Sequence, residues 1–213
     1  MTRRAAAIAG ALALAAFLAR DAILLRLTPH RAGARPHPEV SSEPRQEASD
    51  RPPFERRFGG RRYRITPRFH WDESARVVSE RPYRWGRAAA ILPEDLALAW
   101  GPVLSPPYAG KISYSQFSRF YFWRTREPGL DRGTIVSHTA NTHVIPATTY
   151  LRRAVRALSR GDDVRLEGWL VDVDGVDDPG FHWGTSTTRE DEGPSSCETV
   201  YLERLTVGER VYE

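Results

Sequence analysis

The stretch that decides the predicted fold is VRLEGWLVDV, residues 164–173. Apolar and polar side chains alternate along most of it, which predicts a strand with one buried face. Val164, Leu166 and Leu170 fall on that face. Gly168 stands between them, where a second backbone can approach closely.

The segments around this strand predict a small sheet. A turn at 174–175 leads to a second strand at 181–188, and a polar loop separates that strand from a third at 198–207. Before the first strand, apolar residues recur at helical spacing over 148–158, and Gly161 follows as a stop. A helix, a hairpin and a closing strand in this order suit a small curled or OB-like antiparallel β-sheet or barrel.

The middle of the chain adds further strands and a second short helix. The helix is predicted at 92–101, because Pro93 lies in its first turn, acids follow it and Gly101 ends it. Alternation of apolar and polar residues predicts strands at 61–67, 75–84, 111–115 and 119–124. The expected fold class is therefore α+β, with two short helices, preceded by an N-terminal hydrophobic helix and a disordered arm.

The N-terminus resembles an export segment. Arg3 and Arg4 precede fifteen residues, 5–19, that include only Ala, Ile, Gly, Leu and Phe. We expect residues 1–27 to be a signal anchor or signal peptide, 28–60 a disordered linker and 61–213 one domain. Residues 5–27 would hold the chain in the inner membrane as a single pass with the domain in the periplasm. Secretion to the periplasm after cleavage is the alternative.

Charge and cysteine content narrow the possible functions. The chain carries a net charge of +4, but residues 61–213 hold 21 basic and 21 acidic residues, so the excess lies in the N-terminal arm. A neutral domain gives no compositional support for a nucleic-acid partner, and none is predicted. Cys197 is the only cysteine, so no intramolecular disulfide can form.

Three motifs carry a resemblance to known proteins. They are SHTANTHVIPA at 137–147, GDDVRLEGWLV at 161–171 and WGTSTTREDEG at 183–193, the last leading to Cys197 and Glu198. In this order they resemble a family of uncharacterised bacterial membrane-anchored envelope proteins. That family couples Ala-Asn-x-His-x-Ile-Pro-Ala to Trp-x-Ser-Ser-x-x-Arg-x-Asp-x-Gly and Cys-Glu. The resemblance implies a tethered extracytoplasmic domain and supplies no activity.

The first motif holds the densest set of polar candidates. On a strand, Asn141 and His143 would share a face that excludes His138. No acid lies within this run and the helical i, i+4 histidine spacing is absent, so no metal site is predicted. We expect the three side chains mainly to bond the backbone of an irregular stretch before the helix that begins at Pro146. They are also candidates for ligand binding.

Cys197 is the candidate nucleophile. His143 or His182 could serve as its base and Asn141 as an orienting group. A reactive thiol favours a helix N-terminus, whereas Cys197 enters a predicted strand and is followed by Glu198, whose charge would raise its pKa. The sequence therefore favours a small buried cysteine over a catalytic one.

The C-terminal loops hold the remaining candidates. His182, Trp183, Arg189 and Glu198 border a loop rich in Ser and Thr that could bind an anionic or sugar ligand. An internal latch between Arg189 and the carboxylates of Asp191 or Glu198 is the favoured interpretation. Four aspartates between 172 and 178 are interpreted as a solvated hairpin tip rather than a calcium loop.

Taken together, the sequence predicts a non-enzymatic binding or assembly module of the cell envelope, without a cofactor and with an envelope protein as its partner. A hydrolase using Cys197 and His143 is the second hypothesis. An OB-like nucleic-acid binder is the third.

Overall fold

The computed structural model describes residues 8–10, 12, 14–17, 31–32 and 37–213. Its strands are β1 (Arg31–Ala32), β2 (Arg45–Ala48), β3 (Phe54–Phe58), β4 (Arg61–Pro82), β5 (Glu94–Ala99), β6 (Ile112–Phe117), β7 (Phe120–Thr125), β8 (Thr139–Pro146), β9 (Asp163–Gly175), β10 (His182–Trp183), β11 (Glu198–Val207) and β12 (Arg210–Tyr212). Its helical elements are a 3-10 turn at Gly101–Leu104, α2 (Arg132–Ser137) and α3 (Thr149–Val155).

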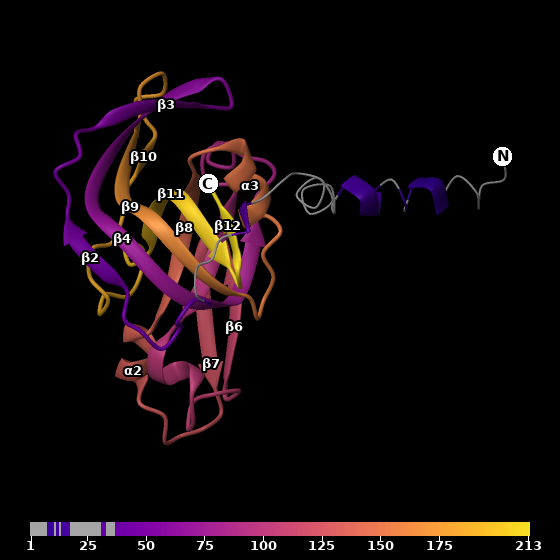
Figure 1. The fold of residues 1–213 in the computed structure, drawn as a ribbon, viewed down its shortest axis with the longest axis vertical. Coiled ribbons are helices and arrows are strands. Elements are labelled where there is room, and N and C mark those ends of the chain that lie inside the picture. The colour runs from indigo at the N-terminus through magenta and orange to yellow at the C-terminus, as the bar shows by residue number, and fades with distance from the viewer. Residues whose placement is uncertain (1–7, 11, 13, 18–30, 33–36) are drawn as a thin grey trace.

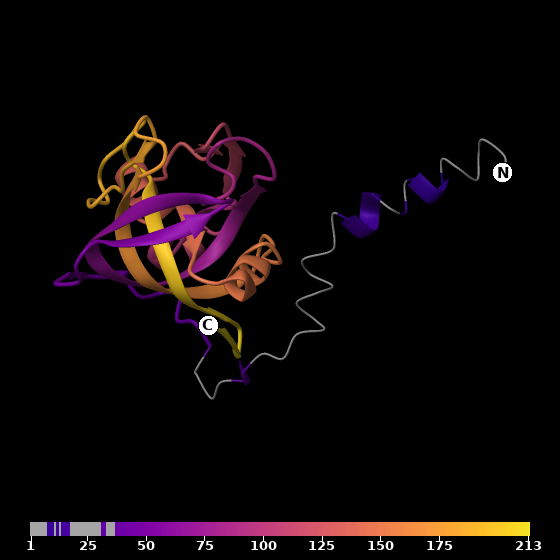
Figure 2. The ribbon, with the colours of Figure 1, turned by 90° about the horizontal axis from the view of Figure 1, so that it is seen from above.

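Most strands of the described residues join one curled, mainly antiparallel sheet (Figures 1 and 2). The long strand β4 pairs with β9 along its first two thirds and with β5 along its last third. β5 pairs with β8, β8 runs parallel to β11, and β11 also pairs with β9. The neighbours therefore follow the order β11, β8, β5, β4, β9, with an additional pairing of β9 and β11, in a curled sheet that is not closed into a barrel.

The side chains on the concave face of this sheet form the main core. Alternate residues of the five strands contribute to it, among them Trp71, Leu98, Val144, Leu170 and Val200, and α3 adds Leu151, Ala154 and Val155. α3 begins at a Thr148 cap whose side chain accepts a bond from the Leu151 amide. The helix predicted at 148–158 is thus confirmed, although it is shorter than expected.

Gly168 occupies the closest approach between β9 and β11. A Cβ built there would lie 2.1 Å from the carbonyl oxygen of Tyr201, and real Cβ atoms essentially never come that near. The expectation that a second backbone approaches Gly168 is confirmed, as is the strand over 198–207.

The helix predicted at 92–101 is wrong, because residues 94–99 form strand β5. All six residues of β5 are buried, since the strand lies between β4 and β8 and is covered on both faces. Leu96 and Leu98 face the main core, whereas Ala97 and Ala99 face the hairpin β6–β7. Burial on both faces removes the alternation by which a strand is recognised, and the Pro-Glu-Asp start then resembles a helix.

Two other predicted boundaries differ in the structure. The strands predicted at 61–67 and 75–84 are one 22-residue strand, β4. The stretch expected to be irregular before α3 is α2 followed by β8, all eight residues of which are buried.

Part of the predicted linker, 28–60, belongs to the sheet. β2 and β3 pair side by side with β4 through residues 45–48 and 54–58. These strands lie along the outer edge of β4 (Figure 1) and expose most of their side chains, which explains why their composition resembles that of a linker.

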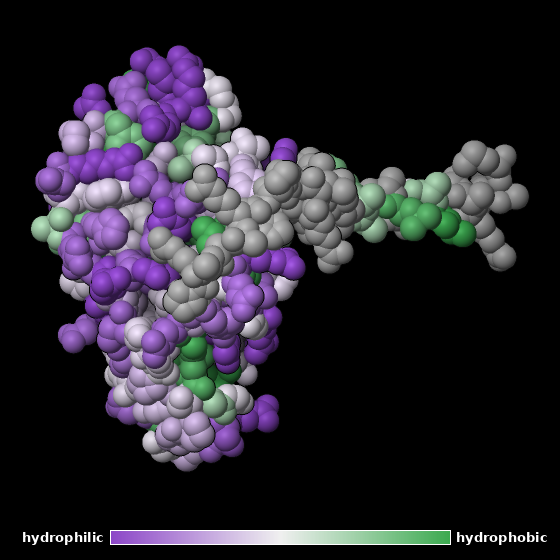
Figure 3. All heavy atoms as spheres, in the orientation of Figure 1, coloured by the Kyte–Doolittle hydropathy of each residue, from purple (hydrophilic) through white to green (hydrophobic). Residues whose placement is uncertain are grey.

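The predicted hydrophobic segment lies largely outside the described residues. Those of its residues that are described, 8–10, 12 and 14–17, are helical, and their large apolar side chains are exposed. Among the described residues, no helix combines the length and apolarity needed to cross a bilayer. The domain face seen in Figure 3 is mostly hydrophilic, with several small apolar areas, one of them near its lower end.

Candidate functional site

Neighbouring strands bring the candidate residues to one face of the sheet. In the register of β5 and β8, Asp95 lies opposite His143. Cys197 directly precedes Glu198, which pairs with Thr142 of β8, and so it lies beside Asn141. Because side chains alternate along a strand, Asn141, His143 and Cys197 share the convex face. The prediction that Asn141 and His143 lie on one face is confirmed.

Asp95 is the centre of a buried hydrogen-bonded group. Its Oδ1 lies 2.9 Å from His143 Nδ1 and accepts a bond of 2.8 Å from Arg119 Nη1. The carboxylate is 1% exposed and the imidazole 3% exposed. The Arg119 guanidinium lies over the ring of Tyr83, 3.4 Å from its centroid. A buried carboxylate that contacts both a guanidinium and an imidazole fixes the orientation of both groups.

The tight turn between β6 and β7 places Arg119 there. Ser118 and Arg119 both have positive φ values, 51° and 72°, as the two central residues of a type I′ hairpin turn do. The Arg119 amide donates to Tyr83 Oη at 3.1 Å, and its carbonyl accepts from Asn141 Nδ2 at 3.0 Å. The sheet thus holds a turn that is unfavourable for residues other than glycine.

The thiol of Cys197 is held in a protonated state. Asn141 Nδ2 lies 3.5 Å from Cys197 Sγ, and the thiol in turn contacts the Arg119 carbonyl at 3.9 Å. Burial, assisted by the charges of Glu198 and Asp95, raises the pKa of Cys197 to about 11. Because the thiolate is the nucleophile, such a thiol is unreactive near neutral pH.

Two pockets flank Cys197. The first, called here the Trp183 pocket, has a volume of about 500 Å³ and is lined by Arg119, His143, Trp183, Thr185 and Cys197 among others. The His143 and Trp183 rings meet edge to face with their centroids 5.0 Å apart. Cys197 and His143 therefore share a cavity, although the thiol forms its hydrogen bonds with Asn141 and the Arg119 carbonyl.

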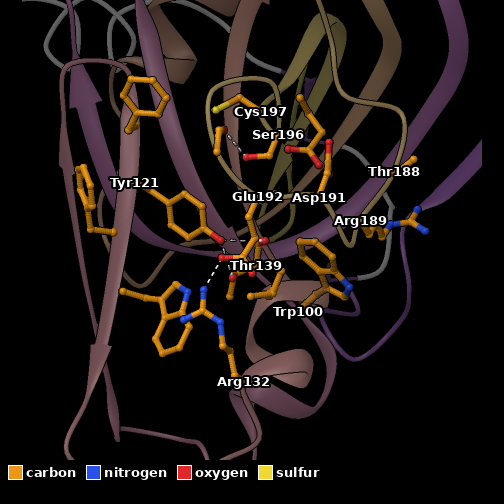
Figure 4. Close-up of a pocket in the computed structure, with 17 residues that line it drawn as sticks. Trp100, Tyr121, Arg132, Thr139, Thr188, Arg189, Asp191, Glu192, Ser196 and Cys197 are labelled. Atoms are coloured by element: carbon orange, nitrogen blue, oxygen red, sulfur yellow. Dashed lines mark hydrogen bonds and ion pairs between the residues drawn. The ribbon is translucent and has the colours of Figure 1, made fainter.

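The second, called here the Tyr121 pocket, has a volume of about 380 Å³ and lies between β7, α2 and the segment 188–198. Tyr121 and Asp191 lie on opposite sides of this cavity (Figure 4). Tyr121 Oη is bound to Thr139, 3.0 Å from its Oγ1. Arg132 of α2 forms an ion pair with Glu192 in the same view.

A layer of polar side chains interrupts the core near this pocket. Glu73, Thr142 and Glu198 alternate with core residues of β4, β8 and β11, so they point to the concave face. Each of the three is at most 5% exposed and has one oxygen without a hydrogen-bond partner among the described residues. Burial raises the pKa of Glu73 to about 7. Burial and then Glu73 raise the pKa of Glu198 well above its usual range.

Other predicted residues lie apart from this group. His138 bonds the Thr134 carbonyl through Nδ1 and contacts Glu43 through Nε2, beside α2. His182 reaches the Trp183 pocket but is mostly exposed and paired with Asp174 at 2.8 Å.

The predicted latch between Arg189 and a carboxylate does not form as a hydrogen bond. Arg189 Nη2 instead donates to the Pro44 carbonyl at 2.7 Å, and its guanidinium lies 5.4 Å from the Trp71 ring centroid. The aspartates at the hairpin tip form ion pairs, Asp177 with Arg62 and Asp178 with Arg87. Over the described part of the chain, no group of three or more His, Cys, Asp or Glu side chains could hold a metal ion.

Three central residues, Tyr83, Asp95 and Arg119, were not among the predicted site residues. Asp95 fell in the predicted helix, and Arg119 was assigned to the start of a strand. A sequence signal for the turn would have been weak, because type I′ turns favour Asn and Gly, whereas this turn is Ser118–Arg119.

The fold and site thus define a curled β-sheet domain with two small pockets beside a protonated cysteine. No family model, curated protein or solved structure matches the chain.

Proposed function

We propose that the chain is a non-enzymatic binding module of the cell envelope, with an OB-like fold and a ligand site beside Cys197. The order of strand pairing supports the fold. Numbered along the chain as one to five, β4, β5, β8, β9 and β11 have the neighbours 1-2-3-5-4 and then strand 1 again. This order supports an OB-like fold, because the OB-fold is a five-stranded, partly open Greek-key arrangement.

The position of the site supports a binding role. OB-folds bind ligands on the face of strands two and three, between the loops that join strands one to two and four to five. Here Asp95 and His143 lie on strands two and three, Tyr83 lies in the first of those loops, and Trp183 and Cys197 lie in the second. The same surface carries the two pockets.

One observation carries the choice of a binding module over an enzyme, namely the raised pKa of the Cys197 thiol together with its bond to Asn141. The test is the rate of alkylation of Cys197, the only thiol, by iodoacetamide as a function of pH. We expect slow alkylation at neutral pH and a rate that rises toward a pKa of about 11. Rapid alkylation at neutral pH that is lost in His143→Gln would refute the proposal.

That second outcome would favour a Cys/His hydrolase, the alternative function. Its supporting observation is that Cys197 and His143 line the same pocket, while Asp95 bonds His143 through Nδ1 and so leaves Nε2 for another partner. The variant Asn141→Ala separates the two functions further. Under either function it removes the bond by which Asn141 lowers the pKa of the thiol, but only in a hydrolase would it also reduce turnover.

The envelope location rests on the N-terminal sequence, where Arg3 and Arg4 precede the apolar residues 5–19, and on the resemblance of three motifs to membrane-anchored envelope proteins. Fusion of alkaline phosphatase after Glu213 tests it. Export predicts an active fusion, and an inactive but intact fusion would refute the periplasmic orientation. Crosslinking of the membrane-bound protein then tests for the envelope protein that we propose as its partner.

A further inference from the structure

The Tyr121 pocket has a chemistry that the proposed function does not specify. We propose that it binds an organic cation, an alkylammonium head group, which pairs with Glu198 and lies against the rings of Trp100 and Tyr121. This inference rests on the proposed ligand site beside Cys197 and names the class of ligand that one half of that site takes.

Glu198 is the main observation. Its side chain lines the Tyr121 pocket and is only 5% exposed. Its Oε2 has no hydrogen-bond partner among the described residues. Buried carboxylates in proteins are paired or hydrogen-bonded, because an isolated buried charge is very unfavourable. A cation that enters the cavity would supply the partner that the chain does not.

The balance of charge in the pocket favours a cation over an anion. Its lining holds two arginines: Arg132, which pairs with Glu192, and Arg189, which donates to the Pro44 carbonyl and keeps its charge. Asp191 accepts a single bond, from Ser186 Oγ at 2.8 Å. With three acids, Asp191, Glu192 and Glu198, against two arginines, the lining carries a formal charge of −1 when all five groups are ionised, which favours a cation over an anion.

The walls of the pocket are aromatic. Trp100, Phe120, Tyr121, Phe122 and Trp123 all line it. The face of an aromatic ring attracts ammonium and guanidinium groups, most strongly when they are desolvated. The pocket already shows one such contact, because the Arg132 guanidinium lies 5.4 Å from the Trp123 ring centroid. Acid and aromatic rings together form the usual environment for an organic cation.

Binding of the cation is coupled to loss of a proton. In the free protein the pKa of Glu198 is raised by burial, then by Glu73 of β4 and by Asp191, while Arg189 lowers it. The other titratable groups at the pocket are Tyr121 of β7, Cys197 and the ion pair of Arg132 and Glu192. Burial therefore favours the protonated form of Glu198 in the free protein. An ammonium group stabilises the ionised form, so affinity increases with pH.

The test uses the full-length protein in detergent and three probes of equal chain length, butylammonium, butanol and butyrate. The indole N–H signals of Trp100 and Trp123 report binding by NMR. We expect shifts with butylammonium, tighter binding as pH rises, and about tenfold or more weakening in Glu198→Gln, the loss expected for one charge-assisted pair. The matched control is Glu73→Gln, another buried acid with an unpartnered oxygen that does not line the pocket. It should keep or increase the affinity.

Several results would overturn the inference. Equal weakening in both variants, or none in Glu198→Gln, would remove Glu198 as the partner. Binding of butyrate or butanol in place of butylammonium would refute the ligand class and leave the binding site standing. Absence of binding by all three would refute the pocket itself, while alkylation of Cys197 judges the proposed function separately. If Glu198→Gln fails to fold, calorimetry of butylammonium binding to the unaltered protein in two buffers measures the protons released on binding. Binding without proton release would contradict the proposed loss of a proton from Glu198.

Discussion

The substitution Glu73→Gln should stabilise the protein, and only above acidic pH. Glu73 is fully buried, and Trp71 Nε1 donates to its Oε2 at 3.2 Å. Burial raises its pKa from 4.5 to about 7. The folded state therefore binds the proton more tightly than the unfolded state does. The stability that this gives is fully present below pH 4.5 and is lost as pH rises through about 7.

The size of the effect follows from the shift in pKa. At ~1.4 kcal/mol for each pH unit, the carboxyl group costs ~3 kcal/mol of folding free energy near pH 8. Glutamine has almost the same shape, carries no charge and can still accept the Trp71 bond through its amide oxygen. We therefore expect Glu73→Gln to gain ~3 kcal/mol near pH 8 and almost nothing near pH 4, which corresponds to about 6–12 °C in Tm near pH 8.

Urea denaturation followed by tryptophan fluorescence at a series of pH values measures this gain. The exposed residue Glu209 provides the control, and Glu209→Gln should leave stability unchanged at every pH. A gain that does not vary with pH would show that the effect comes from packing and not from the buried charge. A loss of stability near pH 8 would refute the raised pKa altogether.

Three further outcomes follow from the fold and the site. Gly168→Ala should lower the free energy of unfolding, measured with urea, by about 3 kcal/mol or more, because its Cβ would meet the Tyr201 carbonyl. The control Gly129→Ala, with no atom within 4 Å of the new Cβ, should leave it nearly unchanged. Asp95→Asn should destabilise the protein by about 3–5 kcal/mol, since it leaves the Arg119 guanidinium without its buried anion. Single-stranded DNA should not retain the protein at moderate salt, because residues 61–213 carry no net charge.

Two elements of the C-terminal half could be predicted because they follow simple periods, whereas the strand predicted at 181–188 is only His182–Trp183 and the turn predicted at 174–175 belongs to β9. β11 spans 198–207, the range that the alternation and the preceding loop predicted. α3 lies within its predicted range because its apolar spacing is helical and one face is buried. The close approach of a second backbone at Gly168 could be predicted, because a glycine inside a strand indicates such an approach.

The elements that could not be predicted are those in which burial on both faces, or exposure, removes the alternation of apolar and polar residues. β5 is buried on both faces, so its acids and apolar residues carry no alternation, and two of the acids, Glu94 and Asp95, are buried with it. β2 and β3 are exposed edge strands whose pairing with β4 depends on contacts far away in the sequence. Neither the burial of β5 on both faces nor the pairing of β2 and β3 with β4 can be inferred from local composition.

Half of the candidate site could be predicted from the sequence, because the alternation of side chains along a strand decides which of them share a face. Asn141, His143 and Cys197 could be placed by strand parity once β8 and β11 were located. Their partners Asp95 and Arg119 could not, because one lies in the strand that was missed and the other reaches the site through a turn with an unusual backbone conformation. A site assembled from the convex face of a sheet needs the strand order, which no single segment contains.

Strand parity also explains why Cys197 and Glu198 have different roles although they are consecutive. At the start of β11, Cys197 faces the convex side, where Asn141 and the Arg119 carbonyl contact its thiol. Glu198 has the parity of Val200 and Leu202 and faces the core, beside Glu73. Both line the Tyr121 pocket because it opens at the strand end, where the two faces meet. The residue next to the buried thiol is therefore the group best placed to receive a cation in the pocket.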